Sequence, residues 1–384
     1  MTTTTNARRR VLPAAVLSAV LLVAPTSAAT AAPPAPPPLP AAAPADPAAV
    51  QAALDALTSS GAQGAQVRVT EDGRELLLRS GTADHGGVRP VPLDGRFRVG
   101  SITKPVVAAV VLQLVGEGRV ELDAPVERYL PGLLPDGDRI TVRMLLQHTS
   151  GLAEYTGLLP VRADGYDDRE AYEEARWQRW EDRDLVALAT ARPLDFEPGT
   201  AWSYSNTGYV VAGMVVEAVT GAPWERAVQE RVLAPLGLRD TAVPGTALLP
   251  PPHAHGYLRI EGQVVNATWL DPSVADAAGA LVSTTADVDR FLAALLGGEL
   301  LPPELLAEMV RPTATSPAYG LGIAVVPLPC GGALYGHDGG IDGYLSVAYS
   351  TPDTRERLVL SLTTAPDPGE FRGGQELLGE VFCG

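Results

Sequence analysis

The sequence predicts an α+β fold, in which antiparallel strands from both ends of the chain flank a mostly helical middle. Two strand-like runs, Ala65–Thr70 and Glu75–Arg79, are joined across Asp72-Gly73, a dipeptide that supplies the positive φ values of a tight hairpin turn. Near the other end, Gly, Pro and Asp separate three apolar runs, as in a sheet meander. These runs are 320–326, 344–349 and 358–362. Between the two ends, residues 121–270 lack clear strand alternation.

The chain is long enough, and apolar enough, for two domains that each have a hydrophobic core. The chain has 384 residues, 46% of them apolar and 19% charged, and domains take roughly 150 residues each. We expect residues 48–120 and 271–384 to form one α/β domain together. Residues 121–270 are expected to form a mostly helical inserted domain.

The N-terminal segment has the order of a secretory signal peptide. Three arginines at 8–10 precede a charge-free apolar run, 11–24, and small residues follow through position 32. The run of 14 residues is shorter than the roughly 20 that a membrane helix needs. We therefore expect residues 1–32 to be removed from an exported protein without a stable membrane anchor, a retained anchor being the alternative. The Pro/Ala-rich stretch 33–47 is expected to be a linker, with the folded part beginning near Ala48.

Charge and cysteine content exclude two classes of site. The formal net charge is −16, and loss of the three leader arginines would leave about −19, which argues against a nucleic-acid partner. Cys330 and Cys383 have neither Cys-x-x-Cys spacing nor a histidine cluster, which excludes a cysteine zinc site. In an oxidising compartment we expect them to form a disulfide that pins the C-terminus, two buried free thiols being the alternative.

Ser101 and Lys104 are the first candidate catalytic pair. Lys104 is the only lysine in the chain, against 28 arginines. Lysine can lose its proton when it is desolvated, whereas a guanidinium cannot, so this position is interpreted as a proton acceptor. The apolar periodicity after Ser101 predicts a helix that ends near Gly116, and positions three apart share a helix face. Ser101 would then lie at the helix N-terminus, where free N–H groups support an oxyanion; a capping serine and a surface lysine are the alternative.

Tyr204 and Asn206 form the second candidate element, on a loop that enters a helix. A tyrosine hydroxyl near an ammonium can be pushed towards phenolate, which makes it a base or a proton shuttle, and an asparagine amide can bind a substrate amide. An asparagine helix cap is the alternative. His148 has no acidic residue nearby in the sequence and is interpreted as structural. His253 and His255 would suit a metal only with a third ligand, and we identify none.

The third candidate element is the glycine-rich run from Gly336 to Gly340, which contains His337, Asp338 and Gly339 at the end of a strand-like segment. Glycines there allow a ligand backbone to approach closely. The strand edge could bind an extended peptide, with one N–H serving as an oxyanion donor. A glycine-rich turn between strands is the alternative.

Taken in order, Ser101-x-x-Lys104, Tyr204-x-Asn206 and His337-x-Gly339 resemble the three active-site elements of serine DD-peptidases and class C beta-lactamases. The likeness covers about residues 50–384 and includes the segments 145–152 and 319–322. The chain is also similar to secreted actinomycete D-alanyl-D-alanine carboxypeptidases/transpeptidases, which carry a cysteine before the third element and another in a terminal Phe-Cys-Gly.

This resemblance implies a beta-lactamase/transpeptidase-like fold with the site in a cleft between the α/β catalytic domain and the inserted domain. It implies that Ser101 is acylated, that Lys104 and Tyr204 move its proton, and that the backbone N–H groups of Ser101 and Gly340 form the oxyanion hole. Substrate would be bound by the side chains and backbone of Asn206, His337, Asp338 and Gly339. Neither a metal nor a cofactor is implied, and the expected partners are peptidoglycan stem peptides or beta-lactams, bound by a monomer.

Asp338 departs from the pattern of this family, which places a hydroxyl residue in the middle of the third element, where it helps to bind the substrate carboxylate. A carboxylate there repels a terminal carboxylate unless it is protonated or turned away, and no Lys or Arg lies between Arg311 and Arg355 to compensate. The change favours an amine-bearing substrate or an uncharged ester. We nevertheless expect a secreted D-alanyl-D-alanine carboxypeptidase, because the cysteine pattern is so similar. The alternatives are a beta-lactamase, esterase or D-aminopeptidase on this scaffold, or a penicillin sensor that acylates without turnover.

Overall fold

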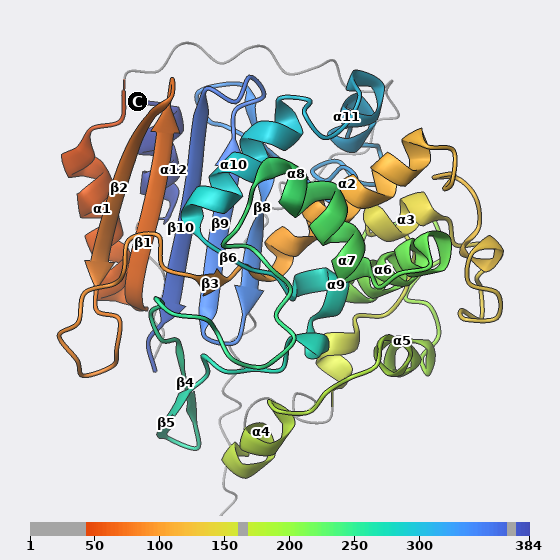
Figure 1. The fold of residues 1–384 in the computed structure, drawn as a ribbon, viewed down its shortest axis with the longest axis horizontal. Coiled ribbons are helices and arrows are strands. Elements are labelled where there is room, and N and C mark those ends of the chain that lie inside the picture. Colours follow the sequence, from red (N-terminus) through yellow and green to blue (C-terminus); the bar gives the residue numbers. More distant parts are fainter. Residues whose placement is uncertain (1–43, 160–167, 367–373) are drawn as a thin grey trace, which may run out of the picture.

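A six-stranded antiparallel sheet crosses the molecule (Figure 1). The structure is a computed structural model that describes residues 44–159, 168–366 and 374–384. The strands of the sheet are β1 (Ala62–Glu71), β2 (Arg74–Gly81), β7 (Ala324–Pro327), β8 (Ala333–Ile341), β9 (Tyr344–Ser350) and β10 (Glu356–Thr364). Their order is β2-β1-β10-β9-β8-β7, so strands from the two ends of the chain lie side by side. The predicted α+β class, with a sheet built from both ends, is confirmed.

The predicted hairpin opens the sheet. β1 pairs with β2 so that Glu71 lies opposite Arg74, and the two residues between them, Asp72 and Gly73, have φ values of 48° and 79°. Positive φ at both turn residues matches the right-handed twist of the flanking strands, which is why this dipeptide predicted the turn. β1 also pairs with β10, and it is buried along most of its length.

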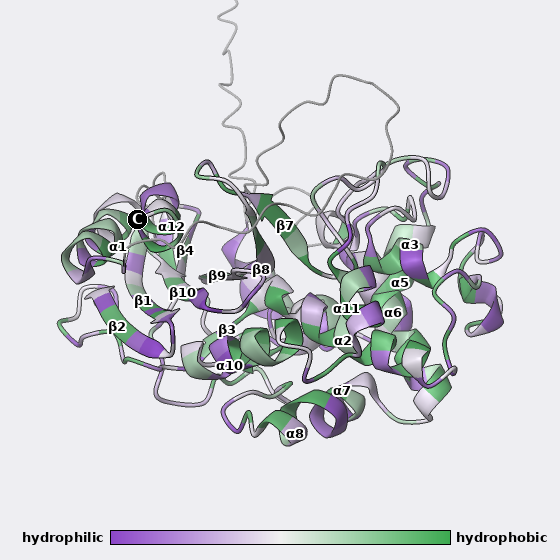
Figure 2. Cartoon of the chain, turned by 90° about the horizontal axis from the view of Figure 1, so that it is seen from above, coloured by the Kyte–Doolittle hydropathy of each residue, from purple (hydrophilic) through white to green (hydrophobic). Residues whose placement is uncertain are grey.

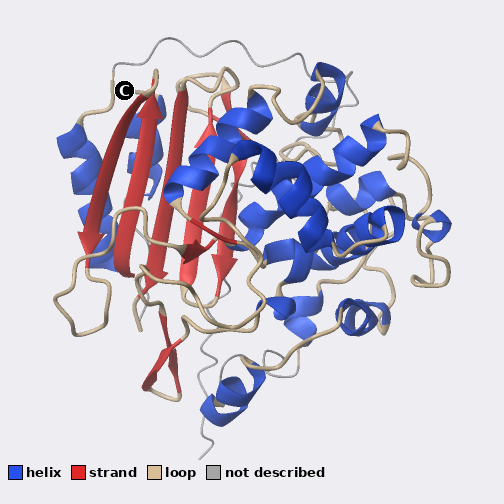
Figure 3. Cartoon of the chain, viewed as in Figure 1, coloured by secondary structure: helices blue, strands red, loops and turns tan. Residues whose placement is uncertain are grey.

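Helices α1 (Pro47–Ser60) and α12 (Gly374–Phe382) cover one face of the sheet, at its β1 and β2 side (Figure 3). Apolar side chains of both helices pack with those of β1 and β10 in one cluster. α1 begins earlier than expected, because Asp46 caps its first turn and Pro47 starts it. Ala45 is already buried, so the last residues of the predicted linker belong to the folded part.

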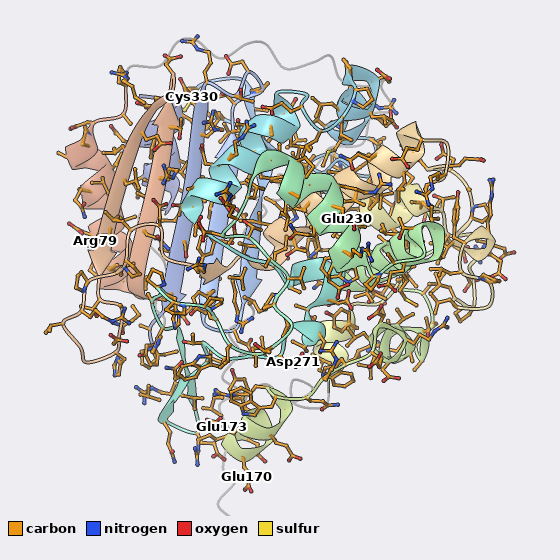
Figure 4. All side chains as sticks on the ribbon, in the orientation of Figure 1. Arg79, Glu170, Glu173, Glu230, Asp271 and Cys330 are labelled. Carbon is orange, nitrogen blue, oxygen red and sulfur yellow. A yellow bond between two sulfur atoms is a disulfide. The ribbon has the colours of Figure 1, made fainter. Side chains whose placement is uncertain are left out.

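A disulfide joins α12 to the turn between β7 and β8. Cys330 and Cys383 are bonded, with their Cα atoms 5.7 Å apart, and Cys330 lies at the same end of the sheet as the C-terminus (Figures 1 and 4). The predicted disulfide is confirmed.

Helix α10 (Thr285–Leu296) covers the other face of the sheet, on the side where the helical part of the molecule lies. Behind α10, helix α2 (Thr103–Gly116) is buried on almost every side, which explains its uninterrupted apolar sequence. The remaining helices are α3 (Val142–Leu146), α4 (Arg169–Ala175), α5 (Asp182–Thr190), α6 (Asn206–Thr220), α7 (Trp224–Val228), α8 (Ala234–Leu236), α9 (Asp276–Gly279) and α11 (Pro303–Met309). In Figure 2 hydrophobic residues colour β7 and much of these inner helices, while hydrophilic residues lie towards the outer turns.

Residues 121–270, which show no clear strand alternation in the sequence, include one short hairpin. β4 (Tyr257–Ile260) and β5 (Gln263–Asn266) form a hairpin that projects beside α4 (Figure 1). Each strand has four residues, too few for alternation to stand out, and the turn at 261–262 has positive φ at both residues. The hairpin is stabilised where Ile260 and Val265 pack on Tyr172 of α4. A further two-residue pair joins β3 (Phe97–Arg98) to β6 (Val282–Ser283).

The first of the three C-terminal runs is only partly a strand. Residues 320–323 form a loop, and β7 starts at Ala324. A Cβ on Gly320 would lie 2.0 Å from the carbonyl oxygen of Met309, and Gly322 has a φ of 80°, so both glycines serve close packing of this loop rather than a strand.

The predicted division into two domains stays a prediction, and the signal peptide, 1–32, lies outside the described residues. Within the ranges that the structure describes, no helix has the length and apolar character needed to cross a membrane.

Candidate active site

Ser101 lies in a single turn of 3₁₀ helix, Gly100–Ile102, that runs directly into α2. The turn is tight: Gly100 has a φ of 54°, and a Cβ on it would come within 2.8 Å of the backbone nitrogen of Gly340. The hydroxyl of Thr103 donates to the Gly100 carbonyl at 2.8 Å and holds the turn closed. The structure therefore brings Ser101 and Gly340, the two predicted oxyanion donors, to adjoining stretches of backbone.

Lys104 is fully buried one helical turn after Ser101. Its Nζ lies 2.9 Å from Ser101 Oγ, 2.6 Å from Asn206 Oδ1 and 2.8 Å from the carbonyl oxygen of Ala278. Burial lowers the pKa of Lys104 to about 7, against an opposing effect of the Glu154 charge. Pro105 does not disturb this arrangement, because a proline in the first turn of a helix needs no N–H partner. At neutral pH a large share of Lys104 is therefore the free amine.

The hydroxyl of Tyr204 donates to Ser101 Oγ at 2.8 Å. A shift of Tyr204 towards phenolate is not found, because burial raises its pKa far above the ordinary value, and the hydrogen bond with Ser101 offsets only part of that effect. Tyr204 stays protonated and faces the nucleophile as a donor. The sequence argument assumed a neighbouring ammonium, whereas burial favours the neutral form of Lys104 as well.

Asn206 is fixed by a residue that the sequence analysis did not single out. The two oxygens of Glu154 accept hydrogen bonds from the backbone N–H and the side-chain Nδ2 of Asn206, at 2.5 and 3.1 Å. Asn206 Oδ1 is thereby directed at Lys104. Glu154 lies two residues beyond the segment 145–152, and its distance of 52 positions from Asn206 left no local signal for this contact.

His337 and Gly339 face the helical side of the sheet. The Nδ1–H of His337 donates to the Asp338 carbonyl, and Nε2 accepts from the hydroxyl of Tyr319 at 2.8 Å. Burial lowers the pKa of His337 to about 3, and the Lys104 charge adds to this effect. Both ring nitrogens are thus occupied by the protein itself. A Cβ on Gly339 would lie 1.9 Å from the Val99 carbonyl oxygen, which shows how closely β8 approaches the turn that carries Ser101.

Successive side chains of a strand point to opposite faces, so Asp338 lies on the other face of β8 from His337 and Gly339. There the hydroxyl of Tyr349 is its hydrogen-bond partner. Burial raises the pKa of Asp338 to about 6, and the tyrosine only partly opposes this. The Asp338 charge also contributes to the raised pKa of Tyr204, so its electrostatic effect extends through the strand to the residues around Ser101. Among the described residues, no Lys or Arg contributes to the pKa of Asp338, as the sequence predicted. At neutral pH most of Asp338 is therefore ionised, and no described cation compensates its charge.

The two histidines considered as metal ligands lie apart from these residues. The rings of His253 and His255 stack at 5.1 Å, and His255 Nδ1 is 3.4 Å from Asp84. In the part of the chain that the structure describes, no group of three His, Cys, Asp or Glu side chains is arranged to hold a metal ion.

The chain has clear relatives among known proteins. The beta-lactamase family model matches residues 47–381. Esterase EstB of Burkholderia gladioli is 40% identical over 207 residues, which are 51% of this chain and 52% of that protein. Penicillin-binding protein 4* of Bacillus subtilis (strain 168) is 28% identical over 319 residues, 76% of this chain and 66% of that protein. The chain thus spans about half to two thirds of the length of these relatives.

Solved structures with the same fold cover more of the chain. A D-stereospecific amidohydrolase from a Streptomyces species superimposes with a TM-score of 0.81 and 40% identity, over 88% of this chain and 99% of that one. A D-amino acid amidase from Ochrobactrum anthropi SV3, complexed with L-phenylalanine, superimposes with a TM-score of 0.74 and 31% identity, over 87% of this chain and 96% of that one.

Proposed function

Because the chain belongs to the beta-lactamase family and is a serine hydrolase by that membership, we propose that it is a D-stereospecific amidohydrolase that acts through an acyl-enzyme on Ser101. The observation that carries this choice is the charge of Asp338, which reaches the site from the other face of β8, since it contributes to the raised pKa of Tyr204. A leaving group with its own carboxylate, such as D-alanine, would be repelled there, whereas ammonia or an uncharged amine would not. The 40% identity with the Streptomyces D-stereospecific amidohydrolase supports the same choice.

Lys104 is the proposed general base. A neutral amine has two N–H donors, and Lys104 has two neighbours that can only accept from it, Asn206 Oδ1 and the Ala278 carbonyl. Its lone pair then remains for the third neighbour, the hydroxyl proton of Ser101 at 2.9 Å between the heavy atoms. The surrounding acceptors therefore orient the free amine for proton abstraction.

Tyr204 is the proposed acid. As Ser101 Oγ bonds to the substrate carbonyl carbon, its proton passes to Lys104, and the backbone N–H groups of Ser101 and Gly340 stabilise the oxyanion. When the C–N bond breaks, Tyr204 gives its proton to the departing nitrogen. The proton on Lys104 then returns to Tyr204, since both groups adjoin Ser101 Oγ within 2.9 Å. Water then enters in the place of the amine and the proton transfers run in reverse. The Tyr204 proton passes to Lys104, Tyr204 takes a proton from the attacking water, and Lys104 returns its proton to Ser101 Oγ as the ester bond breaks and the acid leaves.

A comparison of leaving groups tests the proposal. We expect the protein to hydrolyse D-phenylalanine amide at least about 10-fold faster, by kcat/KM, than an N-acyl-D-Ala-D-Ala peptide, with the L-amide as the stereochemical control. Asp338→Thr, which restores the hydroxyl of the family pattern, should reverse much of this preference. Equal rates on both substrates, unchanged by Asp338→Thr, would overturn the proposal.

A D-alanyl-D-alanine carboxypeptidase is the second candidate, and the Cys330–Cys383 disulfide favours it because carboxypeptidases of this family share the cysteine pattern. Intact mass before and after benzylpenicillin distinguishes the candidates, with Ser101→Ala as control. A Ser101-dependent adduct that persists would favour the carboxypeptidase or a penicillin sensor, and multiple turnover would separate these two. Rapid loss of the adduct would indicate a beta-lactamase. Absence of an adduct, in protein that a fluorophosphonate still labels at Ser101, would leave the amidohydrolase or an esterase.

We also propose that the protein is exported. The signal-like order of residues 1–32 is the reason, and a disulfide suits an oxidising compartment. N-terminal sequencing of protein recovered from culture medium tests this, since an intact leader on cell-associated protein would contradict export.

A further inference from the structure

His148, which the sequence analysis interpreted as structural, contacts the residues that directly precede and follow Tyr204 in the chain. It follows α3 with a φ of 60° and is 1% exposed. The backbone N–H of Ser203 donates to the His148 carbonyl at 3.0 Å, and the backbone N–H of Ser205 donates to His148 Nδ1 at 3.2 Å. Residues 203 and 205 are the immediate neighbours of Tyr204, so one histidine holds the loop on each side of the proposed acid.

The imidazole ring also packs directly on Tyr204. The two ring centroids are 4.3 Å apart at an interplanar angle of 34°. Three further aromatic rings lie near the imidazole: Tyr319 at 4.7 Å, Tyr209 at 5.4 Å and Trp202 at 5.9 Å. The ring contact restricts the tilt of the phenol, and the two hydrogen bonds restrict its backbone.

The protonation state of His148 follows from these contacts. Nδ1 accepts a backbone N–H, so the single ring proton of the neutral form lies on Nε2. Burial lowers the pKa of His148 well below its usual value, and the charges of Lys104 and His337 act in the same direction. Within the described residues, Nε2 has no hydrogen-bond partner. A buried N–H without a partner weakens a fold, so packing alone is a poor account of a histidine here.

We propose that His148 is a positioning residue, which accepts hydrogen bonds on both sides of Tyr204 and stacks on its ring so that the phenol hydroxyl stays on Ser101 Oγ. The inference rests on the proposed role of Tyr204 as the proton donor to the leaving group. It predicts that loss of His148 affects reactions in which the leaving group needs a proton, and has little effect on reactions in which it does not.

Two esters separate these cases without depending on the amide substrate. p-Nitrophenyl acetate releases a stabilised anion, whereas ethyl acetate releases an alkoxide that must be protonated. His148→Phe keeps an aromatic ring but loses the acceptor for Ser205. His148→Asn places an oxygen near the position of Nδ1, and asparagine tolerates positive φ better than most residues. Rates are measured per active site, counted by fluorophosphonate labelling of Ser101.

We expect His148→Phe to lower kcat/KM by about 100-fold on ethyl acetate and by less than about 5-fold on p-nitrophenyl acetate. The comparison uses kcat/KM because it reports acylation, whereas both esters form the same acetyl-enzyme and share its hydrolysis. His148→Asn should recover most of the loss, and Tyr204→Phe should show the same split as His148→Phe. If the phenylalanine variant fails to fold, His148→Gln, whose oxygen lies one bond further out, replaces it as the variant without the acceptor.

An equal loss on both esters in the His148 variants would overturn the inference and return His148 to a structural role. A Tyr204→Phe variant without the split would instead refute Tyr204 as the acid, and the inference would fall with it. Failure to hydrolyse any D-amino acid amide, with the split intact, would refute only the proposed substrate.

Discussion

Two buried basic side chains on the helical side of the sheet, Arg68 and Lys104, are held in opposite ways. Arg68 on β1 donates to both oxygens of Asp94 at 2.7 Å and to Glu75 at 2.5 Å. Burial acts to lower the pKa of Arg68, but the two carboxylates outweigh it and the pKa is raised. Lys104 is surrounded by a hydroxyl, an amide oxygen and a carbonyl, and burial lowers its pKa to about 7.

The difference shows how one fold assigns a structural and a chemical task to buried basic groups. Carboxylates in direct contact keep Arg68 charged, so it joins β1 to the segment before β3. The carboxylate whose charge raises the pKa of Lys104, Glu154, makes hydrogen bonds to Asn206 instead. A buried amine without a carboxylate in contact favours the neutral form, which stabilises the fold less but can accept a proton.

The largest expected effect is that of Lys104→Met. Without the base, kcat/KM on an amide substrate should fall by about 10³-fold or more. The free energy of unfolding should be unchanged or higher, because an apolar side chain replaces a desolvated amine. Amide hydrolysis and urea unfolding at pH 7 measure the two effects. A variant that loses both activity and stability would show that Lys104 serves the fold.

Arg68→Met is the matched change at the buried arginine, whose charge is paired with two carboxylates. It leaves Asp94 and Glu75 without their common partner, and both are partly exposed, so we expect a loss of roughly 2–3 kcal/mol in the free energy of unfolding. Activity of the folded variant should stay within about 3-fold of wild type, since the described ion-pair partners of Arg68, Asp94 and Glu75, lie outside the site. Urea unfolding and fluorophosphonate-normalised rates check this. A loss of activity with unchanged stability would contradict the comparison.

The pH dependence of stability sharpens the contrast further. The pKa of Lys104 falls from 10.5 to about 7 on folding, so the folded state binds its proton less well than the unfolded state. Below pH 7 the full penalty applies, and it is relieved between pH 7 and 10.5. We expect the free energy of unfolding of wild type, relative to Lys104→Met, to rise by about 2 kcal/mol from pH 7 to pH 9. A flat difference would show that the buried amine keeps its ordinary pKa.

Glu154→Gln tests the distant carboxylate and has the smallest expected effect. Its charge raises the pKa of Lys104, so removing it should move the midpoint of the kcat/KM–pH profile from about 7 to a lower pH, by somewhat less than about 1 unit. The glutamine oxygen can still accept from the backbone N–H of Asn206. Glu75→Gln is the control at Arg68 and should leave the midpoint in place. A shift to higher pH would contradict the assigned electrostatics.

Much of the site was predictable because its parts are local. Ser101 and Lys104 share a helix face by their spacing, Tyr204 and Asn206 are two residues apart, and the glycines at 336 and 339–340 indicated close backbone approach. The hairpin turn at 72–73 was equally local. Four-residue strands such as β4 and β5 were not predictable, because their stability comes from packing on α4, which periodicity cannot show.

The sequence by itself determined the three active-site elements, their order, the fold class, the disulfide and the unusual Asp338. Only the tertiary structure decided how these groups ionise and orient: that Lys104 is fully buried against the Ala278 carbonyl, that Glu154 holds Asn206, that Tyr204 stays protonated and that His148 contacts the loop on both sides of it. The physical reason is that a pKa depends on desolvation and on the nearest charges, which segments far apart in the sequence supply only after they have packed together.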